Sequence, residues 1–231
     1  MTTVVLFDID GTILASGGVG RRAFEGALEA RIGLRGAAEY RYDGKTDRQI
    51  GRDLMRMAGH ADADIDAMLD GIIADYLVRL QGEIDRGVAG VRVHAGILDL
   101  LDALEARDDV LLGLLTGNVV DGASLKLRAA GIATERFRVG AFGSDHEHRP
   151  ELPAIAQARA SALLGHDVAG RSVVIIGDTP ADVHCGRGIG ARAVAVATGH
   201  FTVEQLAEHD PFAVFQDLSD TKAAVSAICD A

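Results

Sequence analysis

A short apolar run close to the start of the chain, residues 4–7, is followed at once by Asp8 and Asp10 and then by a Gly-Thr pair. An apolar run bounded this tightly by charges is typical of a buried parallel strand. In open α/β sheets, ligands bind beyond the carboxyl ends of the strands, so both aspartates stand where chemistry is expected. Taken alone, the same residues could equally begin a turn, because Asp and Gly are common turn residues.

Two further apolar runs also end in polar side chains. We expect strands at 110–115 and 173–176, and the polar residues that follow them are Thr116 and Asn118, and Asp178 and Asp182. Each cluster by itself could be no more than a helix cap or a dipole partner for the next helix. The carboxyl ends of parallel strands, however, lie at the same edge of a sheet. Three polar clusters at equivalent strand ends therefore favour one shared site.

Strands and helices alternate through the second half of the chain. Further strands are expected at 137–142, 192–197 and 212–215, and helices at 97–107, 121–130 and 152–164. This alternation predicts an α/β fold with a doubly wound, Rossmann-like parallel sheet covered by helices on both faces. Residues 19–86 differ, because helical patterns at 21–31, from 46 or 47 to 59, and at 63–85 leave no convincing strand. They predict an all-α insertion after the first strand.

Charge and composition exclude several classes of protein. The 231 residues carry a formal net charge of −11, which argues against a nucleic-acid surface. No apolar run approaches the roughly 18 residues of a membrane span, and no signal peptide is apparent. The two cysteines, Cys185 and Cys229, form no disulfide framework and suit a reducing cytoplasm. We therefore expect a soluble cytoplasmic protein, in which an anionic substrate would need local cations or a metal.

Three segments of the sequence resemble the motifs of a known family. Residues 7–12, 115–118 and 177–182 resemble, in order and context, the signature motifs of the haloacid dehalogenase (HAD) superfamily. The insertion is similar to that family's helical cap domain, which implies an α/β catalytic core of residues 1–15 and 92–231 and a cap of residues 16–91. Within the chain, residues 44–47 and 144–150 look most like phosphoglycolate-phosphatase-type hydrolases. The resemblance covers essentially the whole chain.

The resemblance and the chemistry together assign roles to four acids. Asp8 would attack phosphorus and form an aspartyl phosphate, and Asp10 would serve as general acid and then as general base. A carboxylate that approaches a phosphate dianion needs positive charge, and Mg²⁺ prefers oxygen ligands. The resemblance implies that Asp8, the main-chain carbonyl of Asp10 and Asp178 hold Mg²⁺. We expect Asp182 to support this site rather than to ligate the metal directly.

The transferring phosphoryl group would be held by the Thr116 hydroxyl and the backbone amides of Gly117 and Asn118. The family generally has a lysine at its third motif that contacts both nucleophile and phosphate, whereas this chain has Arg149 there. Arginine stays charged but differs from lysine in reach and geometry. Of the three lysines in the chain, Lys126 is the other candidate, although a solvated helix position is the stronger interpretation. We predict that Arg149 takes this role.

Lys45, in a Gly-containing turn of the insertion, is predicted to contact substrate, although an exposed turn lysine is an equally good interpretation. His146 and His148 are expected to be polar loop residues rather than metal ligands, because the acids already suit Mg²⁺.

These residues predict a Mg²⁺-dependent phosphatase, monomeric or homodimeric, that acts on a small phosphorylated metabolite, with 2-phosphoglycolate the best single guess. A phosphomutase of the same fold is the alternative. A dehalogenase is disfavoured by Asp10, and a non-catalytic binding module by the retention of Asp8, Asp10 and Asp178.

Overall fold

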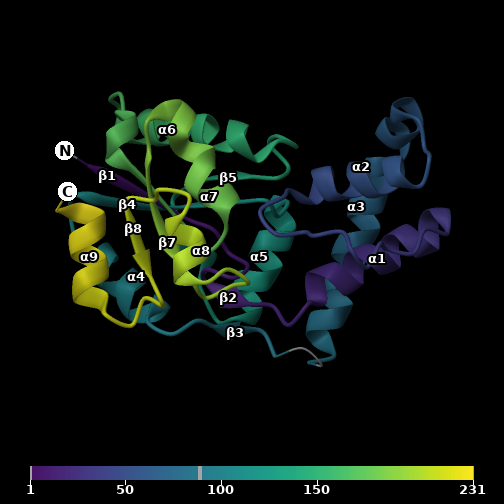
Figure 1. Ribbon diagram of the computed structural model, residues 1–231, viewed down its shortest axis with the longest axis horizontal. Helices are drawn as coiled ribbons and strands as arrows, with labels where there is room; N and C mark the ends of the chain where they lie inside the picture. The colour runs from purple at the N-terminus through teal and green to yellow at the C-terminus, as the bar shows by residue number, and fades with distance from the viewer. Residues whose placement is uncertain (1, 88–89, 231) are drawn as a thin grey trace.

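The computed structural model describes residues 2–87 and 90–230. A six-stranded sheet with the order β5-β4-β1-β6-β7-β8 forms its centre (Figure 1), and every neighbouring pair of strands is parallel. The strands are β1 (Thr3–Phe7), β4 (Val110–Thr116), β5 (Val139–Phe142), β6 (Val173–Gly177), β7 (Arg192–Val196) and β8 (Ala213–Phe215). The predicted parallel α/β sheet is confirmed.

Helices cover both faces of this sheet. They are α4 (Ile97–Glu105), α5 (Val120–Ala129), α6 (Leu152–Leu164), α7 (Pro180–Cys185), α8 (Val203–Ala207) and α9 (Thr221–Cys229). Successive strand residues point to opposite faces, so Val5 and Phe7 of β1 pack in the cluster that includes α4, α5 and α9. Val4 and Leu6 pack in the cluster that includes α6. Figure 1 shows α6 and α4 on opposite sides of the sheet.

The order of the strands determines where a ligand can bind. After β1 the chain places β4 and β5 on one side of it and then β6, β7 and β8 on the other. The carboxyl end of β1, between β4 and β6, is therefore the point where the winding reverses. Open α/β sheets bind their ligands at such a point, because the loops on its two sides turn away from each other and leave a crevice.

Three helices, α1 (Val19–Ile32), α2 (Asp47–Met57) and α3 (Asp62–Asp85), follow β1 in the chain and pack on one another beside the sheet (Figure 1). They bury their own apolar cluster, in which the Phe24 and Tyr76 rings lie 5.1 Å apart. Val119, which precedes α5, also belongs to this cluster. The predicted all-helical segment is thus present, while the proposed domain boundaries stay a prediction. Val88 and Ala89, which fall within the proposed cap, lie outside the described residues.

The segment is entered and left through two short strands, β2 (Leu14–Ala15) and β3 (Arg92–Val93), which pair antiparallel. Two-residue strands are too short to show periodicity, so they could not be predicted from the sequence. Four single-turn 3₁₀ helices were also not predicted: Thr134–Arg136, Arg149–Glu151, Gly170–Ser172 and Gly186–Ile189.

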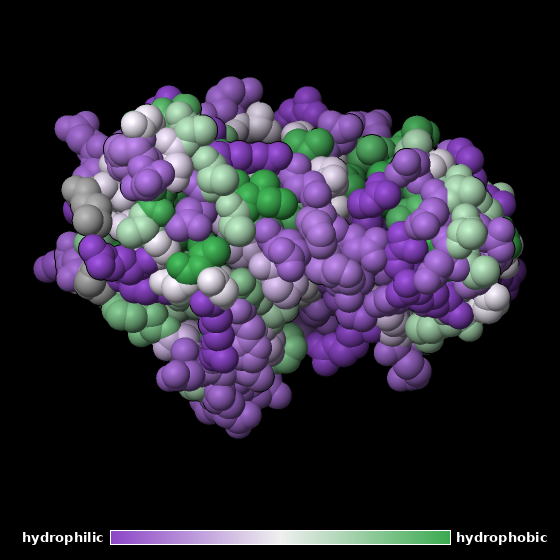
Figure 2. All heavy atoms as spheres, turned by 90° about the horizontal axis from the view of Figure 1, so that it is seen from above, coloured by the Kyte–Doolittle hydropathy of each residue, from purple (hydrophilic) through white to green (hydrophobic). Residues whose placement is uncertain are grey.

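Local signals placed several helix ends correctly. Thr46 caps α2, because its side chain accepts a hydrogen bond from the Gln49 amide at 3.1 Å. Gly165 ends α6 in the left-handed conformation, with φ of 73°. Among the described helices, none is both long enough and apolar enough to cross a bilayer. Figure 2 shows hydrophilic side chains over most of one face, with apolar residues in small separate patches.

Candidate active site

The ends of β1, β4 and β6 bring Asp8, Thr116 and Asp178 to one cavity of about 650 Å³. All three side chains are buried. The cavity is bounded on its other side by residues of the helical segment, among them Tyr40 and Lys45. The structure therefore brings the three polar clusters together, as the strand pattern predicts.

Three buried carboxylates face one another at this edge. One oxygen each of Asp8, Asp178 and Asp182 lies within 4.8 Å of the others. Burial raises the pKa of Asp8 to about 6, and burial together with the charge of Asp182 raises the pKa of Asp178 well above its usual range. The only cation paired with this group among the described residues is Arg149. An excess of buried carboxylate oxygen fits a hard divalent cation such as Mg²⁺.

Two glycines make room for Asp178. A Cβ on Gly11 would lie 2.3 Å from Asp178 Oδ2, and one on Gly199 would lie 1.8 Å from the same atom. Gly11 also has φ of 84°, which a residue with a side chain rarely adopts. The Thr12 hydroxyl donates to Asp178 Oδ1 at 3.1 Å and fixes its orientation. Gly11 and Thr12 therefore accommodate and orient Asp178 at the end of β6. The sequence analysis did not predict this role.

Arg149 lies in the 3₁₀ turn before α6 and is 4% exposed. Its Nη2 atom lies 3.2 Å from Asp8 Oδ1 and forms a close ion pair with Asp182 Oδ1. The second oxygen of Asp182 accepts hydrogen bonds from the Thr179 amide at 3.0 Å and the Thr179 hydroxyl at 2.6 Å. Both oxygens of Asp182 are thus engaged, and Asp182 holds Arg149 against Asp8.

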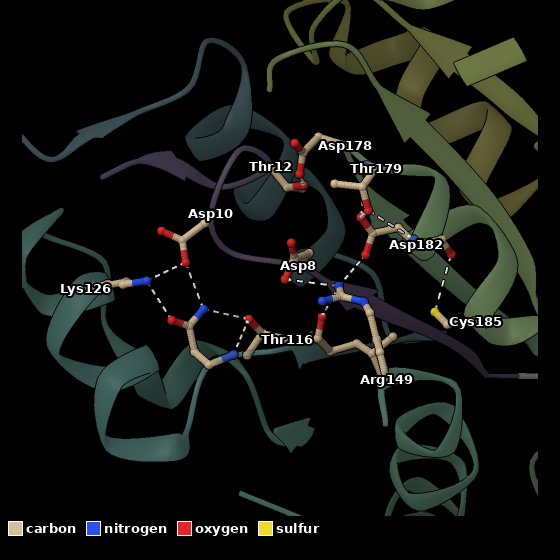
Figure 3. A network of polar contacts seen from close by, with 12 residues as sticks. Asp8, Asp10, Thr12, Thr116, Lys126, Arg149, Asp178, Thr179, Asp182 and Cys185 are labelled. Carbon is tan, nitrogen blue, oxygen red and sulfur yellow. Dashed lines mark hydrogen bonds and ion pairs between the residues drawn. The ribbon is translucent and has the colours of Figure 1, made fainter. Parts of the chain in front are cut away.

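A second cation, Lys126 on α5, binds Asp10. Its Nζ lies 2.5 Å from Asp10 Oδ2 and 2.6 Å from Asn118 Oδ1, while Asn118 Nδ2 donates to the same Asp10 oxygen at 2.8 Å. The Lys126 side chain is only 5% exposed, so the interpretation of Lys126 as a solvated helix residue is wrong. Figure 3 shows Asp8 between this pair and the Arg149–Asp182 pair.

The sequence did hold a signal for Lys126. Residues 119, 122, 123, 126 and 127 recur at the spacing of one helix face, and all five are buried. A lysine at position 126 of that face has to find partners inside the protein. The surrounding protein partly desolvates Asp10, which raises its pKa, but the charge of Lys126 and the hydrogen bonds from Lys126, Asn118 and Ser16 outweigh this effect and lower the pKa.

The Thr116 hydroxyl belongs to the same network. Its oxygen accepts hydrogen bonds from Asn118 Nδ2 at 2.8 Å and from the Asn118 amide at 3.3 Å. Because the oxygen is the acceptor in both, the hydroxyl proton is left to donate elsewhere. Thr116 lines the cavity, where a phosphoryl oxygen could accept that proton.

The loop before α2 rests directly on the loop after β4. The Asp47 amide donates to the Gly117 carbonyl at 2.8 Å, and the Val119 amide donates to Asp47 Oδ2 at 2.8 Å. A Cβ on Gly117 would lie 2.0 Å from the Lys45 carbonyl oxygen, so this approach requires glycine. Burial raises the pKa of Asp47 to about 6. The helical segment is therefore held closed over the cavity, and Asp47 is a contributor that sequence reasoning missed.

Lys45 lines the cavity from this loop. Its Nζ hydrogen-bonds to the Tyr40 hydroxyl at 2.7 Å and pairs with Asp53 at 3.3 Å, while the Tyr40 hydroxyl donates to Asp53 at 2.6 Å. The Lys45 side chain is 29% exposed, so it is no freely solvated turn residue. His146 and His148 are exposed and line a separate hollow, as expected of polar loop residues.

Comparisons with known proteins agree with this architecture. Three of the solved structures that match the fold are described below. CbbY from Rhodobacter sphaeroides in complex with phosphate has a TM-score of 0.72 and 20% identity, over 95% of this chain and 96% of that chain. A predicted phosphoglycolate phosphatase from Haemophilus somnus has a TM-score of 0.71 and 18% identity, over 97% and 98%. A Thermotoga maritima protein named as a β-phosphoglucomutase has a TM-score of 0.62 and 18% identity, over 98% and 99%.

No match was found among curated proteins. At the sequence level, the family model described as haloacid dehalogenase-like hydrolase matches residues 5–187, a span that includes all three strand ends of the site. The chain therefore belongs to the haloacid dehalogenase-like hydrolase family.

Proposed function

We propose that this protein is a Mg²⁺-dependent phosphatase that hydrolyses a small phosphorylated metabolite through an aspartyl-phosphate intermediate, with 2-phosphoglycolate as the first candidate substrate. The arrangement around Asp8 supports this best. A buried carboxylate stands beside the guanidinium of Arg149, and Asp10, two residues on, is held by a different cation. One carboxylate is thus placed to attack while the other is placed to move a proton.

In this mechanism an oxygen of Asp8 attacks phosphorus in line and displaces the alcohol. Asp10 gives a proton to the departing oxygen and then takes one from the water that splits the aspartyl phosphate. Arg149, which already contacts Asp8, offsets the negative charge of nucleophile and phosphate. The Thr116 hydroxyl donates to a phosphoryl oxygen, together with the Gly117 amide and with the Asn118 amide once that amide exchanges its 3.3 Å bond to Thr116 Oγ1 for one to the phosphate.

The carboxylates fit Mg²⁺. Asp8, Asp178 and the main-chain carbonyl of Asp10 would hold it, and when bound it supplies positive charge that neutralises the phosphate and the nucleophile. Asp182 is engaged at both oxygens, by Arg149 and Thr179, which supports a role in orientation rather than direct ligation.

The closed helical segment supports a small substrate that is enclosed during the reaction. The docked loop at 44–47 restricts the entry of water, which strengthens the electrostatic interactions inside. Lys45 brings a cation to the far side of the cavity, where it can attract a second anionic group such as the carboxylate of 2-phosphoglycolate. We place this reaction in the cytoplasm, because Cys185 and Cys229 are both free thiols.

The test is phosphate release from a panel that contains 2-phosphoglycolate, sugar phosphates and p-nitrophenyl phosphate, with Mg²⁺ and with EDTA. We expect Mg²⁺-dependent turnover that Asp8→Asn abolishes. Lys45→Ala should raise KM for 2-phosphoglycolate more than for p-nitrophenyl phosphate, whereas Lys222→Ala, at an exposed lysine of α9, should change neither.

Preference for another ester would overturn only the choice of 2-phosphoglycolate. Isomerisation of a sugar phosphate that requires a bisphosphate activator would favour a phosphomutase. No turnover of any ester with Mg²⁺ present would overturn the phosphatase proposal.

A further inference from the structure

The polar network beside Asp10 has a feature that a simple structural ion pair does not require. Lys126 is buried to 5% exposure, yet its carboxylate partner is 36% exposed and lines the cavity. Moving an ammonium group out of water has a large desolvation free energy. The attraction of a carboxylate that stays partly solvated offsets only part of this free energy. A lysine used only for stability would be better placed in solvent. Lys126 is therefore placed to act on Asp10, with which it forms an ion pair, and its charge also opposes the rise in the pKa of buried Asp47.

The hydrogen bonds fix Asp10 in one orientation. Lys126 Nζ and Asn118 Nδ2 both bind Oδ2, at 2.5 Å and 2.8 Å, and Lys126 also binds Asn118 Oδ1 at 2.6 Å. These three bonds close a triangle, so neither the amide nor the carboxylate can rotate without breaking two of them. Neither donor engages Oδ1 of Asp10. The Ser16 side chain also hydrogen-bonds to Asp10, and Oδ1 is the oxygen that Lys126 and Asn118 leave for proton transfer to or from a ligand.

The same hydrogen-bond network extends to Thr116, which is proposed to bind the phosphoryl group. Asn118 Nδ2 also donates to Thr116 Oγ1 at 2.8 Å, so the positions of Asp10 and Thr116 are set by one side chain. The helical segment packs on it from the other side. A Cβ on Gly20, in α1, would lie only 3.2 Å from Lys126 Nζ. The ammonium is thus enclosed between the sheet edge and the start of the helical segment.

The two buried cations of the described chain, Arg149 and Lys126, do not share a carboxylate. Arg149 pairs with Asp8 and Asp182, whereas Lys126 pairs with Asp10. We propose that Lys126 is a positioning residue for proton transfer: through Asn118 and Asp10 Oδ2 it holds the Oδ1 atom of Asp10 toward the oxygen of the leaving group. This inference rests on the proposed phosphatase function. It assigns Lys126 to the proton-transfer step and Arg149 to the nucleophile.

The dependence of rate on the leaving group tests this role. The p-nitrophenolate anion leaves without a proton, whereas the oxygen of an aliphatic phosphate ester needs one. Lys126→Met keeps the apolar stem and removes the charge. We expect Lys126→Met to lower kcat/KM for an aliphatic ester by about 100-fold, in the range of general acid–base catalysis, and kcat/KM for p-nitrophenyl phosphate far less, because kcat/KM reports departure of the alcohol and not the later hydrolysis of the aspartyl phosphate. Lys126→Arg, which keeps a cation on the same helix face, should restore part of the selective loss, and Lys222→Met is the control.

A second measurement is a double-mutant cycle with Asp10→Asn. If Lys126 acts through Asp10, Lys126→Met should cost little further activity in the Asp10→Asn background. Equal losses on both esters, or full additivity with Asp10→Asn, would overturn the positioning role while leaving the phosphatase proposal intact. If the wild-type protein hydrolyses neither ester, the proposed function fails, and this assignment fails with it. Thermal unfolding of each variant separates a folding defect from a catalytic one.

Discussion

Replacing the nucleophile should make the metal-free protein more stable. Asp8 is buried beside Asp178 and Asp182, and burial raises its pKa from 3.8 to about 6. In the unfolded chain the same carboxyl ionises at its ordinary pKa. Above pH 6 the folded protein must therefore hold a carboxylate that it accommodates poorly. Asp8→Asn replaces that carboxylate by a neutral group of the same shape.

The magnitude follows from proton linkage. A folded-state pKa raised above the unfolded value means that the native state binds more protons, so its stability falls as pH rises between the two values. The shift is roughly two pKa units, and each unit is worth about 1.4 kcal/mol, which gives roughly 3 kcal/mol. This penalty is small below pH 4, grows between pH 4 and 6, and is fully present above pH 6. Asp8→Asn removes it.

The assay is urea unfolding of wild type and Asp8→Asn in EDTA at several pH values from 4 to 8. We expect the variant to be more stable by roughly 3 kcal/mol at pH 7.5 and nearly equal to wild type at pH 4. Added Mg²⁺ should close the gap at pH 7.5, because a ligand that binds the native wild type stabilises it. Asp167→Asn, at an exposed aspartate, should leave the free energy of unfolding unchanged.

Two results would refute this reasoning. The first is an Asp8→Asn protein that is less stable than wild type at pH 7.5 in EDTA. The second is a difference in free energy that does not change between pH 4 and pH 7.5, because only a titrating carboxylate gives that dependence. Loss of phosphate release together with a gain in stability would show directly that the site holds its nucleophile at a cost to the fold.

Three further predictions follow from the site. Arg149→Met should lower the free energy of urea unfolding by roughly 3–5 kcal/mol, because it leaves buried Asp182 without its cation. Arg149→Lys keeps a cation and should lower this free energy by less. Equal losses in the two variants would contradict this explanation. Gly117→Ala should reduce kcat/KM by about tenfold or more, because its Cβ would displace the Lys45 carbonyl, while Gly82→Ala, with open space around it, should not. Asp47→Ala should lower the free energy of unfolding by about 1–3 kcal/mol, because the buried Val119 amide loses its acceptor. Asp47→Asn keeps an acceptor and should lower it by less. A larger loss in the Asn variant would exclude this explanation.

Much of this protein was predictable from local pattern. Continuous apolar runs predicted the buried strands β1, β4 and β6, because strands covered on both faces need apolar residues throughout. Their order along the chain, with helices between them, was enough to predict a parallel sheet with Asp8, Thr116 and Asp178 at one edge. Thr46 and Gly165 marked helix ends because capping depends on only a few neighbouring residues.

The partners of the charged groups were decided only by the tertiary structure. Whether Arg149 or Lys126 would meet Asp8 depends on how far α5 and the turn before α6 lie from β1, which no local pattern records. In the fold each cation takes a different carboxylate. The same holds for Asp47, which is 9% exposed and meets the Val119 amide 72 residues away in the chain. Sequence pattern determines which residues must be buried, whereas the pairing of buried charges is settled by the distances that long-range packing imposes.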